Sequence, residues 1–160
     1  MMKFVHAGTG EVFYATPYSA GFDICANEAG EIQPMKRLLV STGLFAVSGK
    51  EEFELVEKVN KGKTYEILPE LQIRPRSGWA YKNGITVLNS PGTIDFDYLK
   101  PQEIKVLLIN LGDQPWSFIP GERIAQGVMA LVMRAPGIKV KDDTRKGGFQ
   151  STGALSDGTK

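Results

Sequence analysis

The chain contains little of what several common active sites require. It has one cysteine, Cys25, so no internal disulfide can form, and this usage fits a reducing compartment. It has one histidine, His6, which leaves almost no material for a Ser-His-Asp triad or a histidine-rich zinc site. The formal net charge of +1 disfavours general nucleic-acid binding through counterion release.

Long apolar stretches are also missing. No run approaches the ~20 apolar residues of a membrane span, and the first residues, MMKFVHAGTGEVF, do not resemble a signal peptide. We therefore expect a soluble protein of the cytoplasm, or of the host cytoplasm if the source is a virus. At 160 residues, a single domain is expected.

Frequent glycine and proline, 18 and 9 residues respectively, favour many short strands over long helices. The apolar runs Ile104–Leu111 (IKVLLINL) and Gln126–Met133 (QGVMALVM) predict buried strands. Arg37–Val47 (RLLVSTGLFAV) predicts two strands interrupted near Gly43. The chain is therefore expected to be built mainly of strands.

The most polar region, Gly49–Glu70, allows two interpretations. Alternating apolar residues flank the turn-forming segment Asn60–Lys63 (NKGK), which favours a β-hairpin. Apolar residues three apart over Glu51–Val59 would instead suit a short amphipathic helix.

One short helix is well signalled. Ser77 can serve as its N-cap and Gly84 can end it at C′, with Arg76 immediately before the start. A helix N-terminus offers free N–H groups and a partial positive charge. This segment is therefore either suited to an anion or simply a capped helix.

The stretch SPGTIDFDY, residues 90–98, carries two carboxylates. Asp95 and Asp97 are two residues apart and would share one face of a regular strand, with Tyr98 on the other. Such a pair forms a solvated face, a cation site or a general base near a bound metal. Any metal would be a hard cation such as Mg²⁺, held by oxygen atoms and largely by substrate phosphates.

Five separated stretches resemble, in order, the five motifs of the trimeric dUTPase family (dUTP pyrophosphatases). They are SAGFDICA (19–26), PRSGWAYKNGI (75–85), NSPGTIDFDY (89–98), GERIAQ (121–126) and RKGGFQSTG (145–153). Each is weak alone, but five in the right order with suitable spacing are highly specific. The resemblance implies an all-β, distorted jelly-roll domain of the β-clip-like dUTPase type over residues 1–142, with one short helix and an inserted hairpin near 49–70. It also implies a flexible C-terminal arm over residues 143–160 and a homotrimer with active sites at subunit interfaces.

The activity that the resemblance implies is Mg²⁺-dependent hydrolysis of dUTP between the α- and β-phosphates, giving dUMP and pyrophosphate. Asp95 resembles the catalytic carboxylate that deprotonates the attacking water, and Asp23 resembles a carboxylate that contacts the metal through water. Tyr98 would exclude a 2′-hydroxyl, and Phe149 on the arm would stack on uracil. The positions that resemble substrate-binding residues are Arg76, Ser77, Gly78, Asn89, Gly92, Ile94, Tyr98, Lys105, Gln126, Arg145, Phe149, Ser151 and Thr152.

The chain departs from the family pattern at a few places, none of which removes a proposed catalytic group. Leu99–Gln102 replaces a shorter Arg-Gly turn, Gln150 replaces a glycine, and Gly49–Glu70 is longer than usual. Two alternatives remain: a dCTP deaminase, which shares the fold but needs a different third motif, and a regulatory or binding module with weak catalysis, which only the longer segment suggests.

Overall fold

The computed structural model describes residues 2–47, 56–60, 63–98 and 101–139, which form strands and one short helix. In chain order the strands are β1 (Phe4–His6), β2 (Gly21–Cys25), β3 (Gly30–Ile32), β4 (Arg37–Ala46), β5 (Val56–Asn60), β6 (Lys63–Pro75), β7 (Ile85–Val87), β8 (Gly92–Ile94), β9 (Glu103–Asn110), β10 (Trp116–Phe118) and β11 (Arg123–Met133). The prediction of a mainly β protein is confirmed, with β9 and β11 at the two predicted apolar runs.

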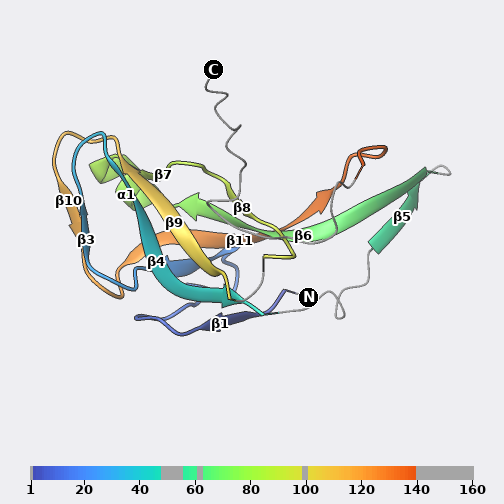
Figure 1. The fold of residues 1–160 in the computed structure, drawn as a ribbon, viewed down its shortest axis with the longest axis horizontal. Helices are drawn as coiled ribbons and strands as arrows, with labels where there is room; N and C mark the ends of the chain where they lie inside the picture. Colours follow the sequence, from blue (N-terminus) through green and yellow to red (C-terminus); the bar gives the residue numbers. More distant parts are fainter. Residues whose placement is uncertain (1, 48–55, 61–62, 99–100, 140–160) are drawn as a thin grey trace, which may run out of the picture.

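Two antiparallel sheets enclose one apolar core (Figure 1). One sheet has the order β1-β4-β9-β7, and the other has the order β2-β11-β6-β5 with β8 also paired to β6. A small β10-β3 sheet lies at one end. Alternate residues of both large sheets point inward, as a half-buried sheet requires. Buried core side chains include Phe22, Ile24, Leu71, Ile73, Ile124, Val40, Leu44, Ile104, Val106 and Leu108.

The segment RLLVSTGLFAV forms one strand, β4, and the prediction of two strands was wrong. Its pairing with β9 shifts register between Val40 and Leu44. Gly43 lies there with a left-handed φ of 67°, which glycine adopts without a steric penalty. The interruption signalled by the sequence is therefore a bulge that bends β4 without ending it.

The polar region contains a hairpin. β5 pairs antiparallel with the start of β6, with Asn60 opposite Lys63, so the predicted hairpin is confirmed. The helical alternative is wrong over residues 56–59, while residues 51–55 lie outside the described part of the chain. The hairpin projects from the body of the domain (Figure 1), and its base is tied to the end of β11 by an Arg134–Glu66 ion pair of 2.8 Å.

The helix α1 (Ser77–Asn83) ends at Gly84, whose φ of 68° is left-handed as predicted. Its N-cap is Arg76 rather than Ser77, and no side chain caps it, so the predicted serine cap was wrong. Arg76 has an extended backbone and lies between the end of β6 at Pro75 and the start of the helix at Ser77. Among the described residues, no helix has the length and apolar character needed to cross a bilayer.

Candidate active site

A polar row crosses three neighbouring strands on the outer face of one sheet. Gln126 on β11 lies opposite Asp23 on β2 and opposite Arg74 on β6. Since neighbouring strands lie about 4.8 Å apart, a carboxylate, an amide and a guanidinium come together there. Ile24 and Ile73, one residue away on β2 and β6, are buried in the core. The period of two in these strands therefore places the polar row outside.

A cleft of about 590 Å³ lies over this row and beside α1. Among the described residues, its lining contains four cations and one carboxylate, together with Ser77, Gly78 and Gln126. A site with this excess of positive charge favours a polyanionic ligand. The charged lining residues are Arg74, Arg76, Lys82, Arg123 and Asp23.

Asp23 organises the cations of the cleft. Its Oδ1 lies 3.2 Å from Arg76 Nε, and its Oδ2 lies 3.2 Å from Arg123 Nη1. Arg76 Nη1 also donates to the backbone carbonyl of Arg123 at 3.1 Å. The Asp23 side chain is only 12% exposed, so these ion pairs are partly shielded from water. One carboxylate thus holds two guanidinium groups together at the cleft in spite of their mutual repulsion.

Two lining glycines leave room at the cleft. A Cβ at Gly21 would lie 3.0 Å from Gln126 Oε1, so a larger residue there would require the Gln126 side chain to shift by a few tenths of an ångström. Gln126 Nε2 then donates to the Pro75 carbonyl at 2.9 Å, just before Arg76. A Cβ at Gly78 would meet no protein atom within 4 Å. Contacts within the described part of the chain therefore do not require glycine at position 78.

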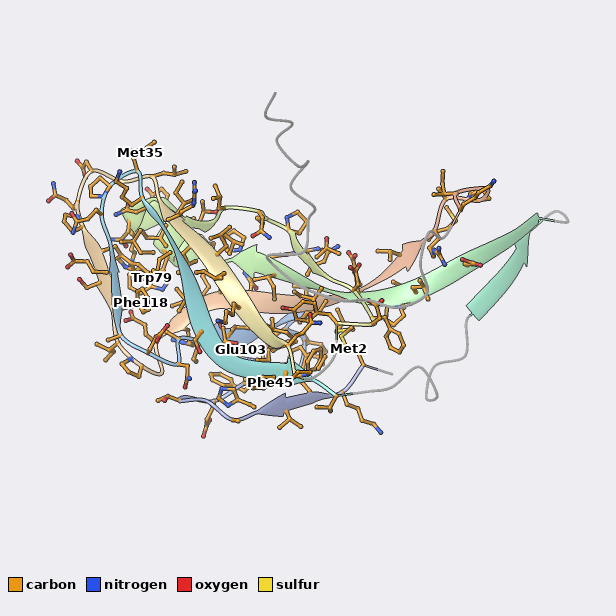
Figure 2. The ribbon with its side chains drawn as sticks, viewed as in Figure 1. Met2, Met35, Phe45, Trp79, Glu103 and Phe118 are labelled. Carbon is orange, nitrogen blue, oxygen red and sulfur yellow. The ribbon has the colours of Figure 1, made fainter. Side chains whose placement is uncertain are left out.

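Trp79 connects the lining of the cleft to the aromatic residues of β10. Its Nε1 donates to the same Arg123 carbonyl that Arg76 contacts, at 3.1 Å. Its ring packs edge-on against Trp116, with centroids 5.2 Å apart, and Trp116 in turn contacts Phe118. Figure 2 shows Trp79 and Phe118 close together at this end of the domain. Trp79 therefore joins α1 to β10 and fixes the backbone on which Arg76 rests.

Replacing Trp79 with phenylalanine is expected to reduce the free energy of unfolding by about 1 kcal/mol, because the ring contact persists while the hydrogen bond is lost. Replacement with alanine is expected to cost roughly 3 kcal/mol, since the ring contact is lost as well. Urea unfolding monitored by circular dichroism measures both. Tyr81→Ala on the same helix is the control, because Tyr81 is 92% exposed and should change stability little. Equal losses of unfolding free energy for Trp79→Ala and Tyr81→Ala would contradict a stabilising role of the Trp79 contacts.

Of the remaining described residues of the predicted site, Gly92 and Ile94 lie on β8, which pairs with β6. Gly92 pairs with Ile73 there, and a Cβ at Gly92 would come within 3.3 Å of the Asn89 side chain. Ile94 is 5% exposed and packs into the core, so only its backbone can reach a ligand. Lys105 lies on β9 in the other sheet, with its Nζ 3.8 Å from Glu103 Oε2.

Asp95 and Asp97 do not lie on a strand, and the prediction that they share a strand face was wrong. β8 ends at Ile94, and the Tyr98 N–H donates to the Asp95 carbonyl at 3.0 Å, which closes a turn. Asp95 is exposed, whereas Tyr98 is 6% exposed and its hydroxyl donates to the Glu103 carbonyl at 3.0 Å. The chain turns here because β9 must return antiparallel to β4 and β7.

The described chain thus separates the predicted residues into two groups. The cleft brings together Asp23, Arg76, Ser77, Gly78 and Gln126. Its lining, within the described residues, contains none of Asn89, Gly92, Ile94, Asp95, Tyr98 and Lys105. Arg145, Phe149, Ser151 and Thr152 lie outside the described residues.

Sequence reasoning assigned no role to three of the four cleft cations. Arg74 is two residues before Arg76 on an extended segment, so period-two spacing could have placed both on one face. Arg123 contacts Asp23 because β2 and β11 pair. Lys82 lines the cleft because α1 lies beside it. These two required the three-dimensional arrangement.

Two antiparallel sheets around one core, with two arginines paired to a single carboxylate, define an all-β protein with a cleft lined mainly by cations. The sequence profile of the dUTPase family matches residues 70–153. The chain is 48% identical over 144 residues to the deoxyuridine 5′-triphosphate nucleotidohydrolase of Wolinella succinogenes, covering 88% of this chain and 84% of the relative. It is also 48% identical over 146 residues to the enzyme of the same name from Cytophaga hutchinsonii, covering 88% and 82%. The chain belongs to the dUTPase family.

Solved structures agree with this assignment. The dUTPase of Streptococcus mutans superposes with a TM-score of 0.65 at 26% identity, covering 85% of this chain and 98% of that one. A dUTPase variant from Staphylococcus aureus phage phi11 superposes with a TM-score of 0.64 at 13% identity, covering 89% and 97%, which shows the fold alone. The predicted family and the jelly-roll-like β fold are confirmed.

Proposed function

We propose that this protein hydrolyses dUTP to dUMP and pyrophosphate, with the triphosphate bound in the cleft. The observation that carries the proposal is the convergence of four cations on one cleft in a chain of the dUTPase family. A triphosphate carries several negative charges, and planar guanidinium groups match its oxygen atoms in pairs. Relatives that match 88% of the chain are named for this reaction.

Within the cleft, Arg76 is the principal phosphate ligand. Asp23 and the Arg123 carbonyl hold its guanidinium in place, so little side-chain freedom remains to be lost when substrate binds. Ser77 and the backbone at Gly78 add donors, and the open space beside Gly78 admits a close approach of the phosphates. Gln126 acts at the same site, partly through water.

The second group of residues binds the nucleoside. Asn89 and the backbone at Gly92, Ile94 and Lys105 read the uracil edge, and the Tyr98 ring lies under the deoxyribose and excludes a 2′-hydroxyl. Asp95 deprotonates the water that attacks the α-phosphate in line with the leaving pyrophosphate. Most of the rate enhancement then comes from positioning and charge stabilisation, with one general base.

Mg²⁺ is the metal that the family resemblance implies, and the phage phi11 dUTPase variant is known to coordinate a structural Mg(II) ion. The described residues contain no cluster of three acidic, histidine or cysteine side chains that could form a metal site of their own. Both oxygens of Asp23 contact arginines, so this residue suits a metal only through its water shell. These residues fit an ion that arrives with the triphosphate, where it would neutralise and orient the phosphates.

A homotrimer with sites between subunits would account for the separation, within one chain, of the cleft residues from the residues around Asp95. If the cleft of one protomer faces the Asp95 turn of another, each site is complete only in the assembly. The C-terminal arm, residues 143–160, then supplies Arg145, Ser151 and Thr152 to the phosphates and Phe149 to the uracil ring. The glycines of the arm let it approach the ligand closely.

Pyrophosphate release with Mg²⁺, measured separately for dUTP, dTTP, dCTP and UTP, tests the proposal. We expect release from dUTP at a kcat/KM at least about 100-fold above that for the other three. Such a result would mean that the pocket reads both uracil and deoxyribose. Release from none of them would favour a binding or regulatory module, and ammonia from dCTP in the same reactions would favour a deaminase.

A further inference from the structure

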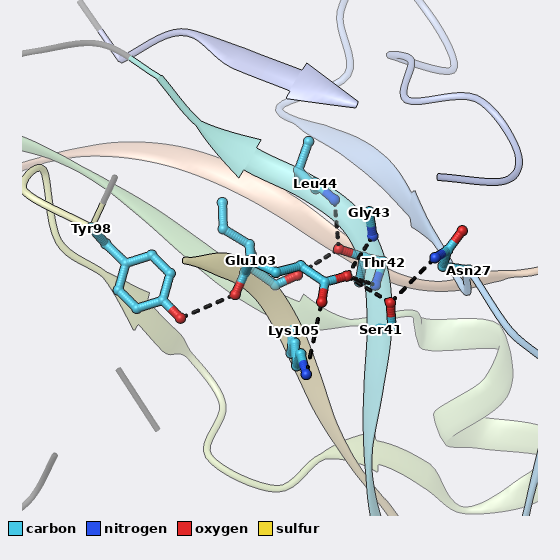
Figure 3. A network of polar contacts seen from close by, with 9 residues as sticks. Asn27, Ser41, Thr42, Gly43, Leu44, Tyr98, Glu103 and Lys105 are labelled. Carbon is cyan, nitrogen blue, oxygen red and sulfur yellow. Dashed lines mark hydrogen bonds and ion pairs between the residues drawn. The ribbon is translucent and has the colours of Figure 1, made fainter. Parts of the chain in front are cut away.

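A carboxylate outside both groups of predicted residues clamps the bulge of β4. Glu103 Oε1 accepts hydrogen bonds from Ser41 Oγ at 2.6 Å, from Gly43 N at 2.7 Å and from Thr42 N at 2.9 Å (Figure 3). The two N–H groups belong to the stretch where the β4–β9 ladder shifts register. The Glu103 side chain therefore replaces the ladder partners that the bulge has lost.

The clamp is ionised at neutral pH. Burial raises the pKa of the Glu103 carboxyl, but hydrogen bonds from Ser41, Gly43 and Thr42, together with Lys105, outweigh it and hold the pKa below its ordinary value of 4.5. The side chain is 18% exposed. A neutral replacement such as glutamine would weaken these charge-assisted bonds and turn an amide N–H₂ toward the Lys105 ammonium.

A second set of bonds joins the same two strands. Thr42 Oγ1 donates to the Ile104 carbonyl at 2.5 Å and accepts from the Leu44 N–H at 3.1 Å. Thr42 is 1% exposed and Ile104 is fully buried. The first two residues of β9 are thus fixed to the bulge by both a side chain of β9 and a side chain of β4.

Tyr98 depends on this anchored segment. Its hydroxyl donates to the Glu103 carbonyl at 3.0 Å (Figure 3). Its N–H closes the turn that begins at Asp95. The connection between Tyr98 and Glu103 is longer in sequence than the Arg-Gly turn that the family resemblance leads us to expect. The Tyr98 ring is buried, and the hydrogen bond to the Glu103 carbonyl holds its hydroxyl end.

We propose that Glu103 is a positioning residue for sugar selectivity: by clamping the start of β9, it fixes the acceptor that holds the Tyr98 ring under the deoxyribose. This inference rests on the proposed function, because it takes Tyr98 as the residue that excludes a 2′-hydroxyl. A ring that shifts even slightly would leave room for that hydroxyl. Loss of the clamp therefore affects the choice between dUTP and UTP more than it affects phosphate chemistry.

The test compares kcat/KM for dUTP and UTP in the wild type, Glu103→Gln, Tyr98→Phe and the double variant. We expect Glu103→Gln to lower the dUTP-to-UTP ratio about tenfold, chiefly through KM. Tyr98→Phe should lower the ratio similarly, and the double variant should add little, since both changes break one connection. Glu31→Gln is the matched control, because Glu31 also accepts side-chain hydrogen bonds, from Gln33 and Ser117, but lies on β3. It should leave the ratio unchanged.

An unchanged ratio in Glu103→Gln, or equal losses for both nucleotides, would overturn the inference and leave Glu103 with a structural role only. If Glu103→Gln does not fold, Ser41→Ala removes one bond of the clamp and should lower the ratio in the same direction. If the wild type hydrolyses neither nucleotide, the proposed function fails. The ratio of dUTP and UTP binding constants, measured by calorimetry on the same variants, then tests Glu103 separately.

Discussion

Replacing Asp95 with asparagine is expected to lower kcat for dUTP by about 100-fold or more, with little change in KM. Asparagine keeps the size of the side chain and can still orient a water molecule, but its amide cannot take up the proton. Asp95 is exposed directly after β8, and its carbonyl already accepts the Tyr98 N–H. The turn therefore holds the backbone at Asp95 on an exposed part of the surface, where a general base can meet substrate. Steady-state pyrophosphate release at saturating dUTP measures the effect.

Asp113→Asn is the control for Asp95→Asn, since it makes the same chemical change at an exposed position after β9. It should retain wild-type kcat. Near-normal turnover of Asp95→Asn would remove Asp95 from the role of base. A parallel loss of kcat and of thermal stability would instead indicate that the substitution disturbs the turn and not the chemistry.

The strands that were predicted correctly are those whose patterns are local. β9 and β11 are apolar runs, and both strands are dictated by side chains within a few residues of each other. β4 was divided wrongly because Gly43 signals a break, whereas the bulge is held by Glu103, some 60 residues away. Long-range side-chain partners of this kind leave no mark on local periodicity.

In the site, too, single residues could be predicted from short motifs, whereas contacts between residues far apart in the sequence could not. Motif resemblance predicted roles for Asp23, Arg76 and Gln126, which lie together in the cleft, but nothing local indicated that Asp23 would contact Arg123, which lies 100 residues later. The pairing of β2 with β11 creates that contact. The turn from Asp95 to Tyr98 was also missed, because an alternating pattern of acidic and apolar residues suits a strand as well as a turn.

Replacing Arg76 with glutamine is expected to lower kcat/KM for dUTP by about 100-fold, because a charge-assisted, paired contact to phosphate is lost. The change also removes the partner of Asp23 Oδ1, which leaves that carboxylate paired only with Arg123 among the contacts described above. Arg134→Gln is the matched control. It deletes the same charge from an ion pair at the base of the hairpin, outside the cleft lining, and should leave kcat/KM unchanged. Equal losses in both variants would mean that overall charge, and not this cleft, attracts the nucleotide.

Mixing the two inactive variants extends this test to the assembly. If Arg76 and Asp95 of one site come from different subunits, a trimer that contains both Arg76→Gln and Asp95→Asn chains has one site with neither change. Random reassembly of equal amounts should therefore restore about a quarter of the wild-type rate. Each variant subjected alone to the same unfolding and refolding should remain inactive. If both residues of a site came from one chain, every site would carry one of the two changes, and mixing would restore nothing. Recovered activity would thus explain why a single chain separates its cleft from its Asp95 turn.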